Sequence, residues 1–216
     1  MRIGLYTWQR AVIVCALGML SACSVLPEAP VRDSYRLPIS SFPAPASQPV
    51  PVDWSLRVAT PHSGQWLDSR RMLVIRQDNQ INVYKGAQWS DPPPVLARDR
   101  ILDAFRADGR VPFVSNEAGS LKADLALHSD LRNFHVEYQE NRPFVRLQLD
   151  ASLVATASRN AIATRSFSIT LPTKGEQVPD IVEAFGAATD RLSQEVVEWT
   201  MLQAKSGANR LSATPS

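Results

Sequence analysis

The side chains that could carry out chemistry are few in this chain of 216 residues, and they lie far apart. Both cysteines fall within the first 23 residues, which excludes a disulfide framework or a multi-thiolate zinc site in the rest of the chain. The sequence contains no nucleophile elbow, P-loop or dinucleotide-binding motif, and its carboxylates are spread singly. We therefore predict no catalytic site, no metal site and no non-covalent cofactor. Three histidines fit no metal-ligand spacing and are expected to be exposed: His62, His128 and His135.

Cys23 is the side chain whose neighbours indicate a definite reaction. Met1–Arg10 is basic, and the apolar run Ala11–Leu20 would span only about 15 Å as a helix, half of a roughly 30 Å hydrocarbon core. Residues 1–22 therefore have the pattern of a signal peptide. Leu20-Ser21-Ala22-Cys23 matches the lipobox of bacterial lipoproteins, in which the thiol takes up a diacylglyceryl group.

By that resemblance, we expect cleavage between Ala22 and Cys23, a covalent lipid on the Cys23 sulfur and acylation of the new amino group. Two or more acyl chains hold a protein firmly on its membrane. In enterobacterial lipoproteins an Asp after the lipidated Cys favours retention in the inner membrane, so Ser24 favours the outer membrane. An ordinary signal peptide with a chance Cys, or an uncleaved anchor, remains the alternative.

The composition is that of a globular protein, with 44% hydrophobic and 20% charged residues. Removal of residues 1–22 takes away Arg2 and Arg10 and leaves 21 basic residues against 21 acidic ones. A neutral chain without a basic block binds polyphosphate poorly, so nucleic acid is not an expected partner.

Residues 23–52 are predicted to be a lipid anchor followed by a proline-rich tether. Seven of the sixteen prolines fall in Ser24–Pro51, and an extended polyproline chain of that length would reach on the order of 85 Å. Residues 35–37 could interrupt this tether as a short edge strand. A loosely packed N-terminal arm is the equal alternative to a free tether.

Residues 53–204 are predicted to form a single α+β domain, a largely antiparallel sheet covered by two main helices. Alternating apolar residues indicate the strands, and a one-residue shift of that alternation indicates a β-bulge near Arg132-Asn133. Helical spacing indicates helices at Val95–Ala107, whose charges would form a solvated face, and at Pro179–Ala204. The expected strands are Trp54–Thr60, Met72–Arg76, Ile81–Tyr84, Val111–Val114, 123–138, 145–155 and 163–171. Met72–Arg76 and Ile81–Tyr84 are expected to pair as a hairpin, and Gln88–Pro94 is expected to form a loop. Residues 205–216 are predicted to be a polar, frayed tail.

Trp66, Trp89 and Pro92 are candidate partner contacts, because the two tryptophans lie at the edges of elements beside loops and aromatic residues are favoured anchors in interfaces. The alternative for Trp89 is packing against Pro92-Pro93-Pro94.

The sequence resembles the ABC-type transport auxiliary lipoproteins. The resemblance rests on the lipobox, Tyr35-Arg36-Leu37, the segment Trp66–Arg76, Ile81–Tyr84 and the turn Trp89-Ser90-Asp91-Pro92-Pro93, in which Ser90 replaces the commoner Ala. The resemblance implies an outer-membrane lipoprotein on the periplasmic face that acts without catalysis. Its partner would be the periplasm-spanning MCE-domain protein of an inner-membrane lipid transport complex, and the lipoprotein could form a homo-oligomer.

Two other functions are compatible with the sequence. One is a lipid-anchored envelope module that regulates a cell-wall synthase or other envelope machinery. The other is a periplasmic hydrolase whose site is assembled from dispersed residues.

Overall fold

A computed structural model describes residues 32–43, 49–117 and 122–212, with side chains up to Ser206. The predicted signal peptide, Ala22 and Cys23 lie outside these residues. The described elements are β1 (Asp33–Tyr35), β2 (Leu56–Val58), β3 (His62–Ser63), β4 (Arg71–Ile75), β5 (Ile81–Trp89), α2 (Pro93–Asp108), β6 (Val114–Ser115), β7 (Leu125–Gln139), β8 (Arg142–Ala155), β9 (Asn160–Pro172) and α3 (Val178–Ser212).

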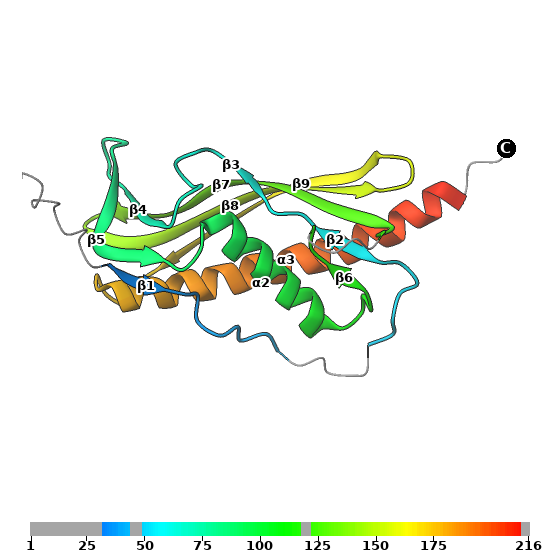
Figure 1. The fold of residues 1–216 in the computed structure, drawn as a ribbon, viewed down its shortest axis with the longest axis horizontal. Helices are drawn as coiled ribbons and strands as arrows, with labels where there is room; N and C mark the ends of the chain where they lie inside the picture. Colours follow the sequence, from blue (N-terminus) through cyan, green and yellow to red (C-terminus); the bar gives the residue numbers. More distant parts are fainter. Residues whose placement is uncertain (1–31, 44–48, 118–121, 213–216) are drawn as a thin grey trace, which may run out of the picture. The chain divides into compact units, whose positions relative to one another are not determined.

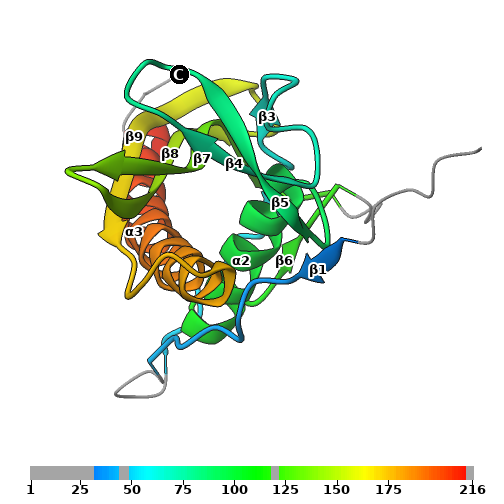
Figure 2. The same ribbon diagram turned by 90° about the vertical axis from the view of Figure 1, so that its left-hand side faces the viewer.

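Strand β7 is the centre of one mixed sheet. It pairs antiparallel with β8 along its whole length, and β8 pairs in the same way with β9. The short strands β2, β3 and β4 each pair with β7 in parallel, while β4 and β5 form the predicted hairpin. The sheet curves around α2 and α3, which lie on its concave side (Figures 1 and 2). The predicted α+β fold is confirmed, with a mixed sheet in which the longest strands are antiparallel.

The predicted β-bulge is present at Arg132. The register of β7 against β8 shifts by one residue between Leu131 and Asn133. Leu127 and Leu131 face the helices before the bulge, and Phe134 and Val136 face them after it; all four are buried. The bulge therefore keeps one continuous apolar face along β7 despite the one-residue shift in the alternation of its sequence.

Aromatic side chains from three elements form the centre of the core. The indole of Trp89, the last residue of β5, meets the rings of Phe134 and Phe185 edge to face, with centroids 5.7 and 5.1 Å apart. The rings of Phe134 and Phe185 stack at 4.7 Å. This cluster joins the hairpin, the central strand and α3.

The proline run does not form the expected loop. Strand β5 continues through Gln88 and Trp89 because β1 pairs beside it, and α2 begins within the prolines, at Pro93. Proline is compatible with the first helical turn, since the backbone N–H groups there have no intrahelical partner. The helix ends where predicted, at Gly109, whose φ of 73° favours glycine.

Helix α3 is longer than the apolar pattern indicates. It begins at Val178, close to the expected start, but continues past Ala204 to Ser212. The expected polar tail at 205–216 therefore begins as helix. Across the described residues, no helix is both long enough and apolar enough to span a membrane.

We expect Trp89→Ala to lower the free energy of unfolding by about 3–5 kcal/mol, because it leaves a cavity between β5, β7 and α3. Guanidinium titrations followed by circular dichroism measure this loss. Trp66→Ala, which alters a half-buried indole, is the matched control and should cost less. Equal losses in the two variants would contradict the central role of Trp89.

Candidate functional site

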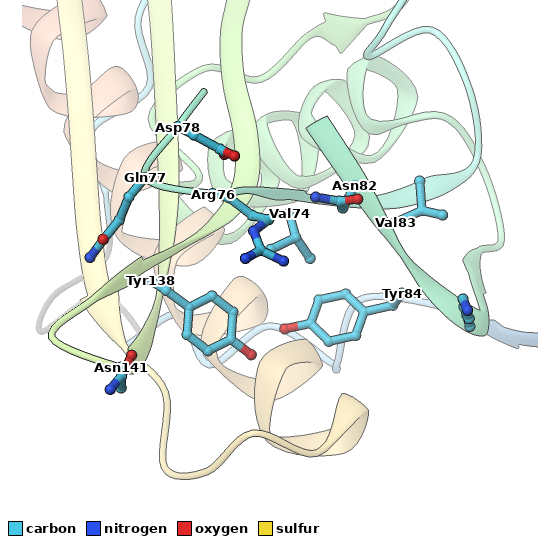
Figure 3. Close-up of a pocket in the computed structure, with 10 residues that line it drawn as sticks. Val74, Arg76, Gln77, Asp78, Asn82, Val83, Tyr84, Tyr138 and Asn141 are labelled. Carbon is cyan, nitrogen blue, oxygen red and sulfur yellow. The ribbon is translucent and has the colours of Figure 1, made fainter. Parts of the chain in front are cut away.

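A hollow of about 700 Å³ lies beneath the β4–β5 hairpin. It is formed by the inner side of the hairpin, the end of β7 and the β7–β8 turn (Figure 3). Its lining mixes cations, amides and apolar groups, and includes Val74, Arg76, Asp78, Val83, Lys85 and Asn141.

Two tyrosines meet at the floor of this hollow. The side chains of Tyr84 and Tyr138 point toward one another (Figure 3). Burial raises the pKa of the Tyr84 hydroxyl well above its ordinary value, and the Tyr138 hydroxyl raises it further without meeting the geometry of a hydrogen bond. The Tyr84 hydroxyl is therefore neutral at physiological pH.

The local sequence explains how Tyr84 reaches this position. The pairing of β4 with β5 is irregular between Arg71, opposite Gln88, and Leu73, opposite Val83, so β5 has extra residues there. Gly86 lies in this stretch with a φ of 74°, a conformation that favours glycine. The sequence alone gave no signal for this site, because no local pattern links residues 74–85 to residues 138–141.

A second feature is the N-terminal arm, residues 32–43, which packs on the domain. Strand β1 pairs in parallel with β5, and Leu37 enters the core. The backbone N–H of Ser41 donates to Asp190 Oδ2 at 3.0 Å, and the Arg100 guanidinium donates to the carbonyl of Pro38. The described part of the expected tether, residues 32–43, is therefore an arm docked on the domain.

Arg100 and Asp190 hold this arm through a largely buried ion pair. Arg100 Nη1 lies 2.9 Å from Asp190 Oδ1, and the two side chains are 6% and 15% exposed. The pair joins α2 to α3, and each partner also binds the arm. The prediction that all charges of α2 form a solvated face is therefore wrong for Arg100, because the arm covers that side of the helix.

Gly186 of α3 permits the close approach of the arm. A Cβ at this position would lie 2.8 Å from Pro38 Cδ and 3.0 Å from its Cγ. A glycine within a helix costs about 1 kcal/mol relative to alanine, so its presence here indicates that contact with the arm outweighs helix propensity.

The three predicted contact residues do not form one surface. Trp89 is 0% exposed, which contradicts its prediction as a partner contact. Trp66 is half-buried on the opposite face of the sheet, with its ring centroid 5.9 Å from that of His135. Pro92 is the N-cap of α2 and is half-buried.

His135 also differs from its prediction as an exposed residue, since it is 1% exposed beneath Trp66. Its Nε2 lies 2.9 Å from Glu137 Oε1, and Arg146 reaches the other carboxylate oxygen at 3.4 Å. Burial lowers the pKa of His135 and outweighs the opposite effect of the Glu137 carboxylate. Burial alone would raise the pKa of Glu137, but His135 and Arg146 together lower it.

The other two histidines, His62 and His128, are exposed as predicted. Within the described residues, no three His, Cys, Asp or Glu side chains come together to hold a metal ion. The hollow and the docked arm are suited to binding and docking.

We expect Asp190→Ala to destabilise the domain by roughly 3–5 kcal/mol, because it leaves the Arg100 charge buried without its partner. The double variant Arg100→Met/Asp190→Leu should recover most of this loss. Urea unfolding of the single and double variants measures the difference. Asp103→Ala, on the exposed side of α2, is the control and should shift stability by no more than about 0.5 kcal/mol. A double variant as unstable as the single one would contradict the burial argument.

The buried His135 predicts a pH dependence of stability. Its pKa is lowered in the folded state, so the unfolded chain binds the proton more readily below the ordinary value of 6.5. Stability from this group is thus complete above that pH and decreases as the pH falls below it. Between about pH 7.5 and about pH 5.5, His135→Gln should lose less stability than the parent protein. Urea titrations across this range measure the slopes, and His128→Gln, an exposed histidine of the same strand, should keep the parent slope.

Comparisons with solved structures agree with this fold. A crystal structure of a Xanthomonas campestris protein is 26% identical and superposes with a TM-score of 0.75, covering 82% of this chain and 99% of that one. A second crystal structure, of an uncharacterised protein, is 15% identical with a TM-score of 0.62 and covers 79% of this chain and 99% of that one; it supports the fold alone.

Sequence comparison gives two further findings. An uncharacterised protein of Bradyrhizobium diazoefficiens is 25% identical over 150 residues, which cover 68% of this chain but only 40% of the relative. Residues 35–197, from the last residue of β1 into α3, match the family model described as ABC-type transport auxiliary lipoprotein component. This match covers most of the chain, and the protein therefore belongs to the family of ABC-type transport auxiliary lipoprotein components.

Proposed function

We propose that the protein is an outer-membrane lipoprotein of the periplasmic face that serves as the auxiliary subunit of an MCE-type intermembrane lipid transport system. The observation that carries this proposal is the family match, which includes the hairpin, the central strands, α2 and most of α3. An auxiliary lipoprotein needs a membrane anchor, which we assign to Cys23, and a partner, which we assign to an MCE-domain protein.

The anchor is the lipid on the Cys23 sulfur, with cleavage between Ala22 and Cys23 and acylation of the new amino group. The order of basic residues, apolar run, small residues and Cys supports it. At least two acyl chains on this residue would hold the domain at the membrane surface. The neutral charge balance of the mature chain is compatible with such a position, since no basic surface would be needed for attachment.

The partner is the MCE-domain protein that spans the periplasm from an inner-membrane complex. The chain would act on it without catalysis, by docking. The sequence contains no nucleotide-binding loop, so the energy for lipid movement would come from the ATPase of that complex. A homo-oligomer of this chain at the outer membrane would present several copies of one docking surface to the partner.

We expect the natively lipidated protein, purified from detergent-solubilised envelopes, to recover an MCE-domain protein that mass spectrometry identifies. Cys23→Ala should reduce this recovery to background and release the protein from outer-membrane fractions, because it removes the sulfur that accepts the lipid. Cys15→Ala changes the other cysteine of the chain and is the matched control, which should fractionate as the parent protein does.

Two results would contradict the proposal. If Cys23→Ala still fractionated with outer membranes, the anchor would be elsewhere. If cell-wall enzymes were recovered in place of an MCE-domain protein, the chain would be a regulator of envelope synthesis.

A further inference from the structure

One end of the described domain gathers the segments that form the hollow. Figure 1 shows the β4–β5 hairpin, the β7–β8 turn and the start of α3 at the same end, and Figure 2 looks directly onto it. Strand β1 begins here as well, because it runs parallel to β5 with Asp33 opposite Ala87, two residues beyond Lys85. We name this region the hairpin end; it comprises residues 74–86, 138–142 and the start of β1 at Asp33.

The chain enters the domain at the hairpin end. Arg32, the first described residue, follows Cys23 by nine residues, and nine fully extended residues span at most about 32 Å. Packing of the arm on α2 and α3 leaves none of residues 32–43 to lengthen this connection. A lipid on Cys23 therefore keeps Arg32 within about 32 Å of the membrane surface.

The opposite end of the domain is much farther from this point. Helix α3 starts at the hairpin end, and the 24 helical steps from Val178 to Leu202, at about 1.5 Å each, cover about 36 Å. Leu202 is 62% exposed, so it is an accessible apolar side chain on the distant part of the same domain.

Apolar side chains are exposed at the hairpin end. Ile81 and Val83 are 51% and 43% exposed and lie two positions apart on β5. Two-residue spacing places both side chains on one face of a strand. Such a pair could bury its surface in the boundary between lipid headgroups and acyl chains.

The hollow beside them has a chemistry that matches phospholipid headgroups. Arg76 and Lys85 line it as phosphate-binding cations, with Asp78 as the one acidic group of the lining. Tyr84 and Tyr138 present phenol rings, which are favoured at membrane–water interfaces because they have an apolar body and a polar tip.

We propose that the hairpin end rests on the lipid bilayer that holds the anchor, with Ile81 and Val83 inserted at the headgroup level and phospholipid headgroups in the hollow. This inference rests on the proposed lipid at Cys23. The domain then meets its membrane in one orientation, with the far part of α3 directed away from the surface.

Fluorescence quenching tests this orientation on the full lipidated chain. The mature chain has Cys23 as its first residue and contains no other thiol, so Val83→Cys introduces a single site for an environment-sensitive dye. The labelled protein is incorporated into vesicles of phosphatidylethanolamine and phosphatidylglycerol that contain lipids with a nitroxide near the headgroup. We expect strong quenching and a blue-shifted emission at residue 83. Ile81→Cys should give the same result if Val83→Cys folds poorly.

Leu202→Cys is the matched control, an exposed leucine on the same domain whose dye should remain unquenched. Co-flotation of the protein with the vesicles tests the lipid anchor independently of the orientation of the domain. Absence of quenching at residues 81 and 83 in co-floating protein would overturn the orientation and leave the anchor intact. A blue shift without quenching would indicate burial against another protein or a second copy and would also overturn it. Protein that fails to float would refute the anchor and the orientation together.

Discussion

The β-bulge in β7 is the constraint on which the rest of the domain depends. Four strands pair directly with β7, and the shift at Arg132 decides which of its side chains face the helices. If β7 stayed regular through Arg132, Phe134 would face away from Phe185, and His135 and Glu137 would face the core. Arg132, the bulged residue, also forms an ion pair on the outer face of the sheet, where its Nε lies 2.8 Å from Asp150 Oδ2. Asp150 stands opposite Asp130, so the guanidinium offsets the repulsion between two facing carboxylates.

The inner face of the sheet also determines where the N-terminal arm docks. It holds α3 in place, and α3 supplies Asp190 and Gly186, the two residues that receive the N-terminal arm. Arg100 completes the contact from α2, so the ion pair joins both helices and the arm at one point. The segment that leads toward the proposed lipid is therefore part of the folded domain, and the freedom of the domain at a membrane is set by the few residues that precede it.

Much of the fold could be predicted, because alternation and helical spacing report which face of an element is buried. The bulge, the hairpin, the glycine stop of α2 and the amphipathic part of α3 all followed from these local patterns. The sequence predicts Arg100 and His135 at the surface, and Trp89 either as a contact or packed on the following prolines. Their burial depends on partners that are distant in sequence. The hollow was missed for the same reason: Tyr84 and Tyr138 belong to ordinary strands, and only the sheet register brings them together.

The parallel pairing of β1 with β5 has a mechanical consequence. A load applied at Arg32 along the direction of β1 would be resisted in shear by the ladder from Asp33 to Tyr35, with its hydrogen bonds stretched together. A strand pulled from the side would instead lose these bonds one after another. Beyond β1, the same load passes to Pro38 and Ser41, which the ion pair holds against the helices. Traction on Arg32 would thus meet this ladder before the domain unravels from the N-terminal end of the described arm.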